Sequence, residues 1–376
     1  MLKKEGTIMI TKEITQAFSA FGREGEIVSV EQITAGLINA TYLVTASNGE
    51  KYILQKINTF VFKNPAELME NIVGVTKHLA EKITLGGGDA KRETLSFIAC
   101  KSGKYYHLDS EGGAWRMYFY VDDAHTYNKA ESGEILKSAG ESFGRFMKLL
   151  ADYPAHTLHE TIVNFHNTPS RYEDFLRAVE ADPKGRRAEV EKEIAFVTDR
   201  KEDTHRLTDL LSQGELPLRV THNDTKLNNV LFDKATEKSI CVIDLDTIMP
   251  GLSLYDFGDS IRSGANAAKE DESDPAKIYV DLELFESYTD GYLSQTADSL
   301  NDAEIDNLAF SAKLMTFECG MRFLTDYLNG DVYFRTAYEG HNLVRARNQF
   351  RLIETMEENM DKMQEIVRKY KEKYKA

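Results

Sequence analysis

The chain has 376 residues, 42% of them hydrophobic and 28% charged, and a formal net charge of −15 at pH 7. This length predicts two or three domains with a sizeable buried core, and the composition is typical of a soluble globular protein. The negative charge disfavours nucleic acids and anionic membranes as partners. The chain contains no apolar run of about 18 residues, so no membrane span is expected. The N-terminal apolar patch is too short and interrupted for a signal peptide.

Three cysteines, Cys100, Cys241 and Cys319, lie far apart in the chain and form no Cys-x-x-Cys pair. This spacing argues against a disulfide framework and against a structural zinc site. It indicates a protein of the reducing cytoplasm.

The first third of the chain alternates short β-rich runs with helical segments. Residues 1–25 carry an amphipathic pattern at helical spacing. A second helix is expected to start at Asn64-Pro65, because Asn is a favoured N-cap and Pro is favoured at the first helical position. Strands are expected over residues 27–33, 39–45, 51–57, 95–100, 104–109 and 114–121.

Two segments of this part are candidates for contact with a nucleotide. The turn over residues 34–39 contains Gly36, and the backbone amides of such a turn can face phosphate groups; an ordinary hairpin turn is the alternative. The strand over residues 114–121 contains Tyr118 and Tyr120. It would lead into a hinge whose backbone groups can hydrogen-bond adenine.

From Glu131 onward the pattern is mostly helical. The apolar stripe between Ile135 and Leu150 predicts a helix packed in the core rather than a cofactor contact. Residues 160–215 are polar and helical, with interruptions expected at Pro169 and at residues 183–185. Two or three helices are expected over residues 276–328, and one more, packed on its own lobe, over residues 351–376.

The stretch over residues 219–262 carries the most specific pattern. It places His222, Asp224 and Asn229 on a loop between two short strands, and Asp244 at the end of the next strand. This spacing matches a kinase catalytic loop followed by a metal-binding Asp. Phosphoryl transfer from Mg-ATP requires one carboxylate beside the attacking hydroxyl, and an amide oxygen and a second carboxylate on the metal. The pattern therefore predicts a small-molecule kinase.

Each polar residue of this motif has an expected role. Asp224 is expected to orient the acceptor hydroxyl for attack, although an Asp here can also be a turn or N-cap residue. Asn229 and Asp244 are expected to hold Mg²⁺, because a carboxylate at the end of an apolar strand is costly unless a metal neutralises it. Asp246 would share the metal or orient a bound water. His222 is expected to fix the loop rather than to transfer a proton.

Further charged residues surround the motif. Asp256 is expected to support the catalytic loop through backbone amides, with helix capping as the alternative. Asp259, Arg262 and Arg322 are expected to bind the acceptor, since ring hydroxyls and an acetamide oxygen suit Arg donors; pairing of each Arg with a buried carboxylate is the alternative. Lys226 faces a phosphate or is an exposed side chain without a special role.

Several stretches resemble known families. The Asp loop and the metal strand resemble the aminoglycoside phosphotransferase/choline kinase superfamily, a branch of the protein-kinase-like fold. A resemblance to bacterial N-acetylhexosamine 1-kinases covers nearly the whole chain. Its motifs are YILQ at 52–55, GGAWR at 112–116, THNDTKLNN at 221–229, IDLDTIMPG at 243–251, DFGDSIR at 256–262 and ECGMRFL at 318–324.

The resemblance implies an α+β fold with two lobes. Residues 1–121 would form a small antiparallel-sheet lobe that binds the nucleotide, and residues 122–376 a larger, mostly helical lobe with the catalytic and acceptor sites. The implied reaction is the ATP- and Mg²⁺-dependent phosphorylation of the anomeric hydroxyl of N-acetylglucosamine or N-acetylgalactosamine. Asp224 would be the base, and Arg322 a sugar-binding residue.

The resemblance also places Gln55, Lys56, Tyr118 and Tyr120 at the nucleotide. Many members of the superfamily have Lys or Arg where this chain has Gln55, at the position expected to meet the α- and β-phosphates. Lys56 follows, but strand alternation would direct it to the other face of the sheet. Either the phosphate contact is made differently or the strand is irregular.

Two alternatives remain open. The first is another small-molecule kinase of the superfamily, acting on an aminoglycoside, on choline or on a different sugar. The second is a non-catalytic scaffold that binds a nucleotide. A scaffold would normally have lost Asp224, Asn229 or Asp244, and all three are present.

Overall fold

A computed structural model describes residues 4–34 and 38–375 of the chain. The residues group into two compact units. The sheet unit comprises Met1–Asn128, Leu149–Val163 and Asn228–Pro250, and the helical unit comprises Lys129–Lys148, Asn164–Leu227 and Gly251–Ala376. The predicted α+β class, with an antiparallel sheet and a mostly helical remainder, is confirmed. The lobe boundary after residue 121 stays a prediction, and Gly36 lies outside the described residues.

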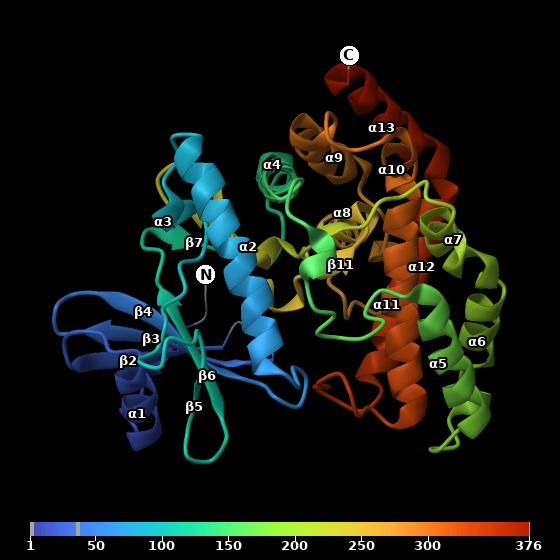
Figure 1. Ribbon diagram of the computed structural model, residues 1–376. Helices are drawn as coiled ribbons and strands as arrows, with labels where there is room; N and C mark the ends of the chain where they lie inside the picture. Colours follow the sequence, from blue (N-terminus) through green and yellow to red (C-terminus); the bar gives the residue numbers. More distant parts are fainter. Residues whose placement is uncertain (1–3, 35–37, 376) are drawn as a thin grey trace. The chain divides into compact units, whose positions relative to one another are not determined.

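The sheet unit contains a six-stranded antiparallel sheet with the order β1-β2-β3-β4-β6-β5 (Figure 1). Its strands are β1 Lys4–Thr7, β2 Ile27–Ile33, β3 Ala40–Ala46, β4 Lys51–Ile57, β5 His107–Leu108 and β6 Ala114–Phe119. Strand β1 was not expected. The strand predicted over residues 95–100 is wrong, because only an isolated bridge from Phe97 to Tyr118 forms there. Its apolar alternation reflects burial of Leu95, Ile98 and Cys100 rather than continuous strand pairing.

The two faces of this sheet differ in character. Helix α1 (Lys12–Ala20), which starts at the N-cap Thr11, packs Ile14 and Phe18 into an apolar cluster with Trp115 on one face. The opposite face carries a smaller apolar cluster, in which Ile53 is one of the buried residues. Its other members are Ile33 and Leu43, with Tyr118 and Tyr120 partly buried against them.

Helix α2 (Pro65–Leu85) begins as predicted, with the Asn64 side chain accepting hydrogen bonds from two backbone amides of the first turn. Within α2, the buried side chain of Asn71 donates to the carbonyl oxygens of His159 (2.8 Å) and Ile248 (3.0 Å). Within the sheet unit, Asn71 thereby ties two later segments of the chain to α2. The unit also contains helix α3 Ala90–Glu93 and a second sheet of β7 Ala124–His125, β9 Val230–Asp233 and β10 Ser239–Val242.

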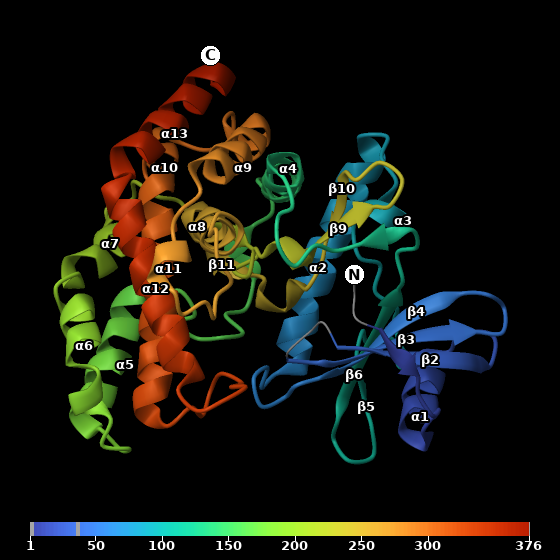
Figure 2. The ribbon, with the colours of Figure 1, turned by 180° about the vertical axis from the view of Figure 1, so that it is seen from behind.

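Helix α11 runs through the helical unit, and α12 lies along it, as Figure 1 and Figure 2 both show. Helices α8 and α5 also pack against α11. Pro169 does not interrupt a helix but occupies the first turn of α5, where its missing N–H is not needed. The helix bounds are α4 Gly133–Leu149, α5 Thr168–Ala181, α6 Glu191–Thr198, α7 Arg206–Ser212, α8 Ser253–Gly264, α9 Leu282–Thr296, α10 Asp302–Asp306, α11 Leu308–Asn329, α12 His341–Glu358 and α13 Met360–Tyr374.

The prediction of two or three helices over residues 276–328 is confirmed by α9, α10 and α11. The single helix expected over residues 351–376 is instead the end of α12 followed by α13, with the break at Asn359. The remaining strands are β8 Arg219–Thr221 and β11 Met249–Gly251. Within the described residues, no helix has the length and apolar content needed to cross a membrane.

Candidate active site

The loop that starts at His222, which is the candidate catalytic loop, follows β8 in the helical unit. Asn223 adopts a left-handed backbone conformation (φ 64°), which Asn tolerates better than most residues. Asp256 in α8 holds the loop, because its two carboxylate oxygens accept the backbone N–H groups of His222 (2.9 Å) and Asn223 (2.7 Å). The Thr225 hydroxyl donates to the Asp256 carbonyl oxygen at 2.5 Å. These are contacts that a residue supporting the loop would make.

His222 is fully buried in the helical unit. Its ring packs edge-on against Phe143 and Phe146 of α4, with centroid distances of 5.7 and 6.1 Å. Its Nδ1 accepts the backbone N–H of Asp224 at 3.3 Å. An imidazole packed among aromatic rings and bonded to its own loop suits the fixing role expected for His222.

Asp224 and Lys226 form an ion pair, with Nζ 2.6 Å from Oδ1. Burial raises the pKa of Asp224, but the adjacent ammonium of Lys226 and the more distant charge of Arg262 outweigh it and lower the pKa overall. Burial likewise lowers the pKa of Lys226, and the Asp224 carboxylate outweighs this effect and raises it. Asp224 is therefore kept ionised, as a carboxyl group that takes up a proton must be.

Replacing Lys226 with Met is expected to shift the acidic limb of the pH profile of kcat/KM to higher pH. Because Lys226 lowers the pKa of Asp224, its removal lets Asp224 become protonated at a higher pH. The matched control is Lys137→Met, since Lys137 pairs with Asp290 at the same 2.6 Å and its side chain has the same 41% exposure. An acidic limb that is identical in wild type and Lys226→Met would contradict the role of this pair.

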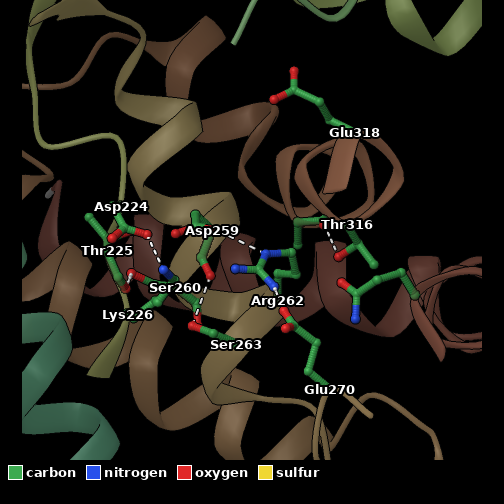
Figure 3. Close-up of polar contacts among 12 residues, drawn as sticks. Asp224, Thr225, Lys226, Asp259, Ser260, Arg262, Ser263, Glu270, Thr316 and Glu318 are labelled. Carbon is green, nitrogen blue, oxygen red and sulfur yellow. Dashed lines mark hydrogen bonds and ion pairs between the residues drawn. The ribbon is translucent and has the colours of Figure 1, made fainter. Parts of the chain in front are cut away.

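Beside this partly exposed pair lies a second pair, on α8, which is buried. Arg262 Nε donates to Asp259 Oδ1 at 2.8 Å, and its Nη1 donates to Glu270 Oε1 at 2.9 Å. Figure 3 shows Asp259 between the Asp224–Lys226 pair and Arg262. The other carboxylate oxygen of Asp259, Oδ2, is buried and has no hydrogen-bond partner among the described residues. A buried carboxylate oxygen without a partner is costly, and a ligand hydroxyl would satisfy it.

A third buried pair joins α11 to the catalytic loop, and it was not expected from the sequence. His166 Nδ1 lies 2.7 Å from Glu318 Oε1, and His166 Nε2 lies 3.0 Å from the Asn223 carbonyl oxygen. Both partners only accept hydrogen bonds, so both ring nitrogens must donate, and the imidazolium form fits. Thr168 donates to the second oxygen of Glu318 at 2.8 Å. His166 and Glu318 thus help to fix the backbone next to Asp224.

Arg322 lies one turn along α11 from Glu318. Its guanidinium is 5.3 to 5.8 Å from the ring centroids of Phe165, Tyr333 and Phe334. Arg322 forms no ion pair within the described part of the chain. Arg322 is therefore a cation surrounded by aromatic rings, and the carboxylate whose charge it acts on is Glu318, which already pairs with His166.

The residues expected to bind Mg²⁺ belong to the sheet unit. Asn229 ends a short 3₁₀ turn (Leu227–Asn229) and is 5% exposed, and its carbonyl oxygen accepts the backbone N–H of Ile243 at 2.9 Å. Asp244 follows β10 in a left-handed conformation (φ 61°) and is exposed. The expectation that burial makes this carboxylate costly is wrong, because Asp244 stands beyond the buried end of the strand. Strained backbone at a non-glycine residue is nevertheless common at functional sites.

No cluster of three or more His, Cys, Asp or Glu side chains that could hold a metal occurs among residues 4–34 and 38–375. Mg²⁺ does not require such a cluster, since it usually keeps several waters and takes one or two carboxylates together with substrate phosphates. Asn229 and Asp244 fit this ligand chemistry.

Asp246 is buried, and both of its carboxylate oxygens are engaged. Oδ1 forms an ion pair with Arg116 Nη1, and Oδ2 accepts a hydrogen bond from Asn39 Nδ2 at 2.5 Å. Asp246 would have to exchange one of these partners to reach a metal. The same Asn39 side chain accepts the backbone N–H of Asn58 at 2.9 Å.

The residues expected at the nucleotide lie on different faces of the sheet. Gln55 is buried and bonds to Thr41 (3.0 Å) and Arg116 (2.9 Å). Lys56 lies on the α1 face, where its Nζ is 2.6 Å from Glu13 of α1. Tyr118 and Tyr120 are partly buried on the face opposite α1, and the backbone N–H of Tyr120 donates to the Lys51 carbonyl oxygen at 3.1 Å.

The structure therefore gathers the predicted site residues in two groups. In the helical unit, Asp224 lies with the charged residues of α8 and with the His166–Glu318 pair that secures its loop. In the sheet unit, Gln55 and Asp246 meet at Arg116, which sequence reasoning did not single out. The sequence does contain one indication of a special role for Arg116, because it is the single charged residue of a mostly apolar strand.

Comparisons with known proteins agree with this fold. A microcompartment-associated aminopropanol kinase is 16% identical, with a TM-score of 0.62 and a match covering 93% of this chain and 97% of that one. An aminoglycoside phosphotransferase from Alicyclobacillus acidocaldarius is 11% identical, with a TM-score of 0.59 and 98% of both chains covered. An amicoumacin kinase in complex with AMP-PNP and Ca²⁺ is 15% identical, with a TM-score of 0.58 and coverages of 91% and 93%.

These identities are low, so the solved structures show a shared fold alone. The family itself is shown by a sequence model, described as the APH phosphotransferase enzyme family, that matches residues 29–282. Because this match spans more than half of its length, the chain belongs to the APH family of phosphotransferase enzymes.

Proposed function

We propose that this protein transfers the terminal phosphoryl group of ATP to the anomeric hydroxyl of an N-acetylhexosamine, either N-acetylglucosamine or N-acetylgalactosamine. The acceptor oxygen forms a bond to the γ-phosphorus as the bond to the bridging oxygen breaks, and ADP leaves. The hydroxyl proton passes to Asp224. Membership of a phosphotransferase family supports the reaction type, and the bound AMP-PNP of the amicoumacin kinase supports an adenine nucleotide as the donor.

Asp224 suits the role of base and orienting group. Its carboxylate is ionised, because Lys226 lowers its pKa, and its backbone N–H is bound to His222. The neighbouring backbone is held by Asp256 on one side and by His166 on the other. A group that must meet the acceptor hydroxyl in one orientation gains from such fixing, because misplacement by about 1 Å can cost about 100-fold in rate.

Asn229 and Asp244 are the residues we assign to Mg²⁺. These two residues would hold the ion beside the nucleotide, where it would supply positive charge against the charge that develops on the transferred phosphate. The exposed carboxylate of Asp244 and the side-chain amide oxygen of Asn229 supply the oxygen ligands that Mg²⁺ prefers.

One observation carries the choice of acceptor class: the carboxylates near the catalytic loop already have partners, which are backbone N–H groups for Asp256 and cations for three others. Asp224 pairs with Lys226, Asp259 with Arg262, and Glu318 with His166.

The ammonium groups of an aminoglycoside would need unpaired carboxylates. Aromatic rings can bind the quaternary ammonium of choline, but the rings of Phe165, Tyr333 and Phe334 already surround the guanidinium of Arg322.

The groups that remain for an acceptor suit a neutral sugar. Asp259 Oδ2 is a buried acceptor suited to a ring hydroxyl. Arg322 supplies donors suited to an acetamide oxygen, and the aromatic rings around it offer an apolar surface. A neutral N-acetylated sugar therefore matches both groups.

The test is a panel of acceptors in which ADP formation is followed with Mg-ATP. N-acetylglucosamine, N-acetylgalactosamine, glucose, kanamycin and choline are compared at equal concentrations, with and without EDTA. We expect turnover with the two N-acetylated sugars, much weaker turnover with glucose, and none after chelation of the metal. Turnover with only kanamycin or choline would contradict the assigned acceptor class.

A further inference from the structure

Arg116 is a buried cation on the sheet face opposite α1. It is 2% exposed, and it stands directly opposite Gln55 in the antiparallel register of β4 and β6. Its Nε donates to Gln55 Oε1 at 2.9 Å, and its Nη1 pairs with Asp246. Burial lowers the pKa of Arg116, but the Asp246 carboxylate outweighs this and keeps the pKa above its ordinary value. The guanidinium is thus charged and fixed in one orientation.

The other cation near this position faces away. Lys56 follows Gln55 in β4, and alternation directs it to the α1 face. There its ammonium pairs with Glu13 at 2.6 Å and lies 3.9 Å from Asp109, above the ring of Trp115. Lys56 is therefore held by carboxylates on the face of the sheet that packs on α1.

Arg116 belongs to a chain of polar contacts that leads toward the exposed Asp244. Gln55 bonds to Thr41 on β3, and Asp246, two residues after Asp244, bonds to Asn39. The negative charge of Asp244 acts on Arg116. A buried ion pair adds little stability compared with apolar residues of similar volume. Stability alone therefore gives no reason for a buried Arg in the strand, whereas an anionic ligand beside Asp244 does.

We propose that Arg116 is the residue of the sheet unit that binds the phosphates of the nucleotide, with Gln55 and Asp246 as positioning residues for its guanidinium. This inference rests on the proposed function, since it concerns how the same site holds ATP. Nε and Nη1 make the hydrogen bonds of the guanidinium within the described residues, and the Phe97 ring centroid lies 5.9 Å from its Cζ, which leaves Nη2 to donate to a phosphate oxygen. The planar fork of Arg matches the geometry of phosphate oxygens.

The test measures binding of ATP, ADP, AMP and adenosine to wild type and to Arg116→Gln by isothermal titration calorimetry in the presence of Mg²⁺. We expect the affinity for ATP and ADP to fall about 10- to 100-fold, as for the loss of a charge-assisted hydrogen bond. The affinity for adenosine should not change, because adenosine carries no phosphate. Arg92→Gln is a control for the loss of an Arg charge in the same unit, since Arg92 pairs with Asp233 at 2.9 Å in a more exposed position.

Two further variants separate ligand binding from folding. Arg116→Lys keeps a charge beside Asp246 but loses the fork, and it should show a smaller loss for ATP and ADP. The double variant Gln55→Lys/Arg116→Gln moves the cation across the strand pair, and it should recover much of the lost ATP affinity because positions 55 and 116 are directly opposite.

Three results would overturn the inference. The first is an ATP affinity in Arg116→Gln equal to that of wild type. The second is an equal loss for adenosine and ATP, which would make the role of Arg116 purely structural. The third is a phosphate-dependent loss in Lys56→Gln but not in Arg116→Gln. A wild type that binds ATP through Arg116 but phosphorylates no sugar would instead refute the proposed acceptor and leave this inference standing.

Discussion

The Asp224→Asn variant is expected to lose about 10²- to 10⁴-fold in kcat, the contribution of a positioned general base. The amide has almost the shape of the carboxylate but cannot take the proton of the acceptor hydroxyl. Lys226 would lose its partner, but its side chain is 41% exposed, so the effect on folding should be small. The measurement is steady-state ADP formation with Mg-ATP and N-acetylglucosamine, together with thermal unfolding of both proteins.

Asp174→Asn is the control for this variant. Asp174 pairs with Arg177 on the surface of α5 and lies outside the candidate site. It should leave kcat and the unfolding temperature close to those of wild type. A kcat for Asp224→Asn within about threefold of wild type, well short of the loss expected for a general base, would remove Asp224 from the reaction.

The Glu318→Gln variant is expected to lower the free energy of unfolding by about 3–5 kcal/mol, the cost of breaking a buried ion pair from one side. The side chains of Glu318 and His166 are 1% and 7% exposed. Water therefore cannot solvate the charge of His166 once the carboxylate of Glu318 is removed. His166 also holds the Asn223 carbonyl oxygen, so kcat should fall together with stability. Urea unfolding at equilibrium measures the first effect, and steady-state kinetics measures the second.

This loss should depend on pH in both directions. Burial lowers the pKa of His166, but the Glu318 carboxylate outweighs this effect and raises the pKa. The stability that results is fully present below the ordinary pKa of about 6.5, and it is lost as the pH rises through the pKa of the folded state. Burial raises the pKa of Glu318, but the charge of His166 outweighs this effect and lowers the pKa. The stability that results is present above the ordinary pKa of about 4.3, and it is lost as the pH falls through the pKa of the folded state.

The difference between wild type and Glu318→Gln should therefore be largest between about pH 4.3 and about pH 6.5 and shrink on either side. Glu354→Gln is the control, because Glu354 makes an exposed ion pair with Arg351 on α12. Exposed pairs contribute about 0–1 kcal/mol. A difference for Glu318→Gln that is as small as for Glu354→Gln, or that does not change with pH, would contradict a buried His166–Glu318 pair.

Local features of the sequence predicted much of the fold. Helix α2 starts at Asn64-Pro65 because capping and proline preferences act within one turn. Strand alternation predicted that Lys56 and Gln55 lie on different faces of the sheet, and the structure agrees. The strand expected over residues 95–100 failed for a related reason. Its alternation recorded burial, which continuous strand pairing and isolated packing produce equally well.

The pairs that complete the candidate site were beyond this reasoning, because they join residues far apart in the chain. His166 and Glu318 are 152 residues apart, and Arg116 and Asp246 are 130 apart. Spacing within a motif reports on one loop or one helix face, and it carries no information on which distant element packs against it. The motif around Asp224 was recognisable because its residues are close in sequence.

In the proposed reaction, the anomeric oxygen of an N-acetylhexosamine receives the phosphoryl group. The most direct test of this reaction is ³¹P NMR, with coupling to the sugar protons, of the product formed from N-acetylglucosamine and Mg-ATP by the wild-type protein. We predict a phosphate coupled to the proton on C1, with equimolar ADP, and no such product with Asp224→Asn over the same time. A phosphate on any other oxygen of the sugar, or ADP formation without a phosphorylated sugar, would contradict the account.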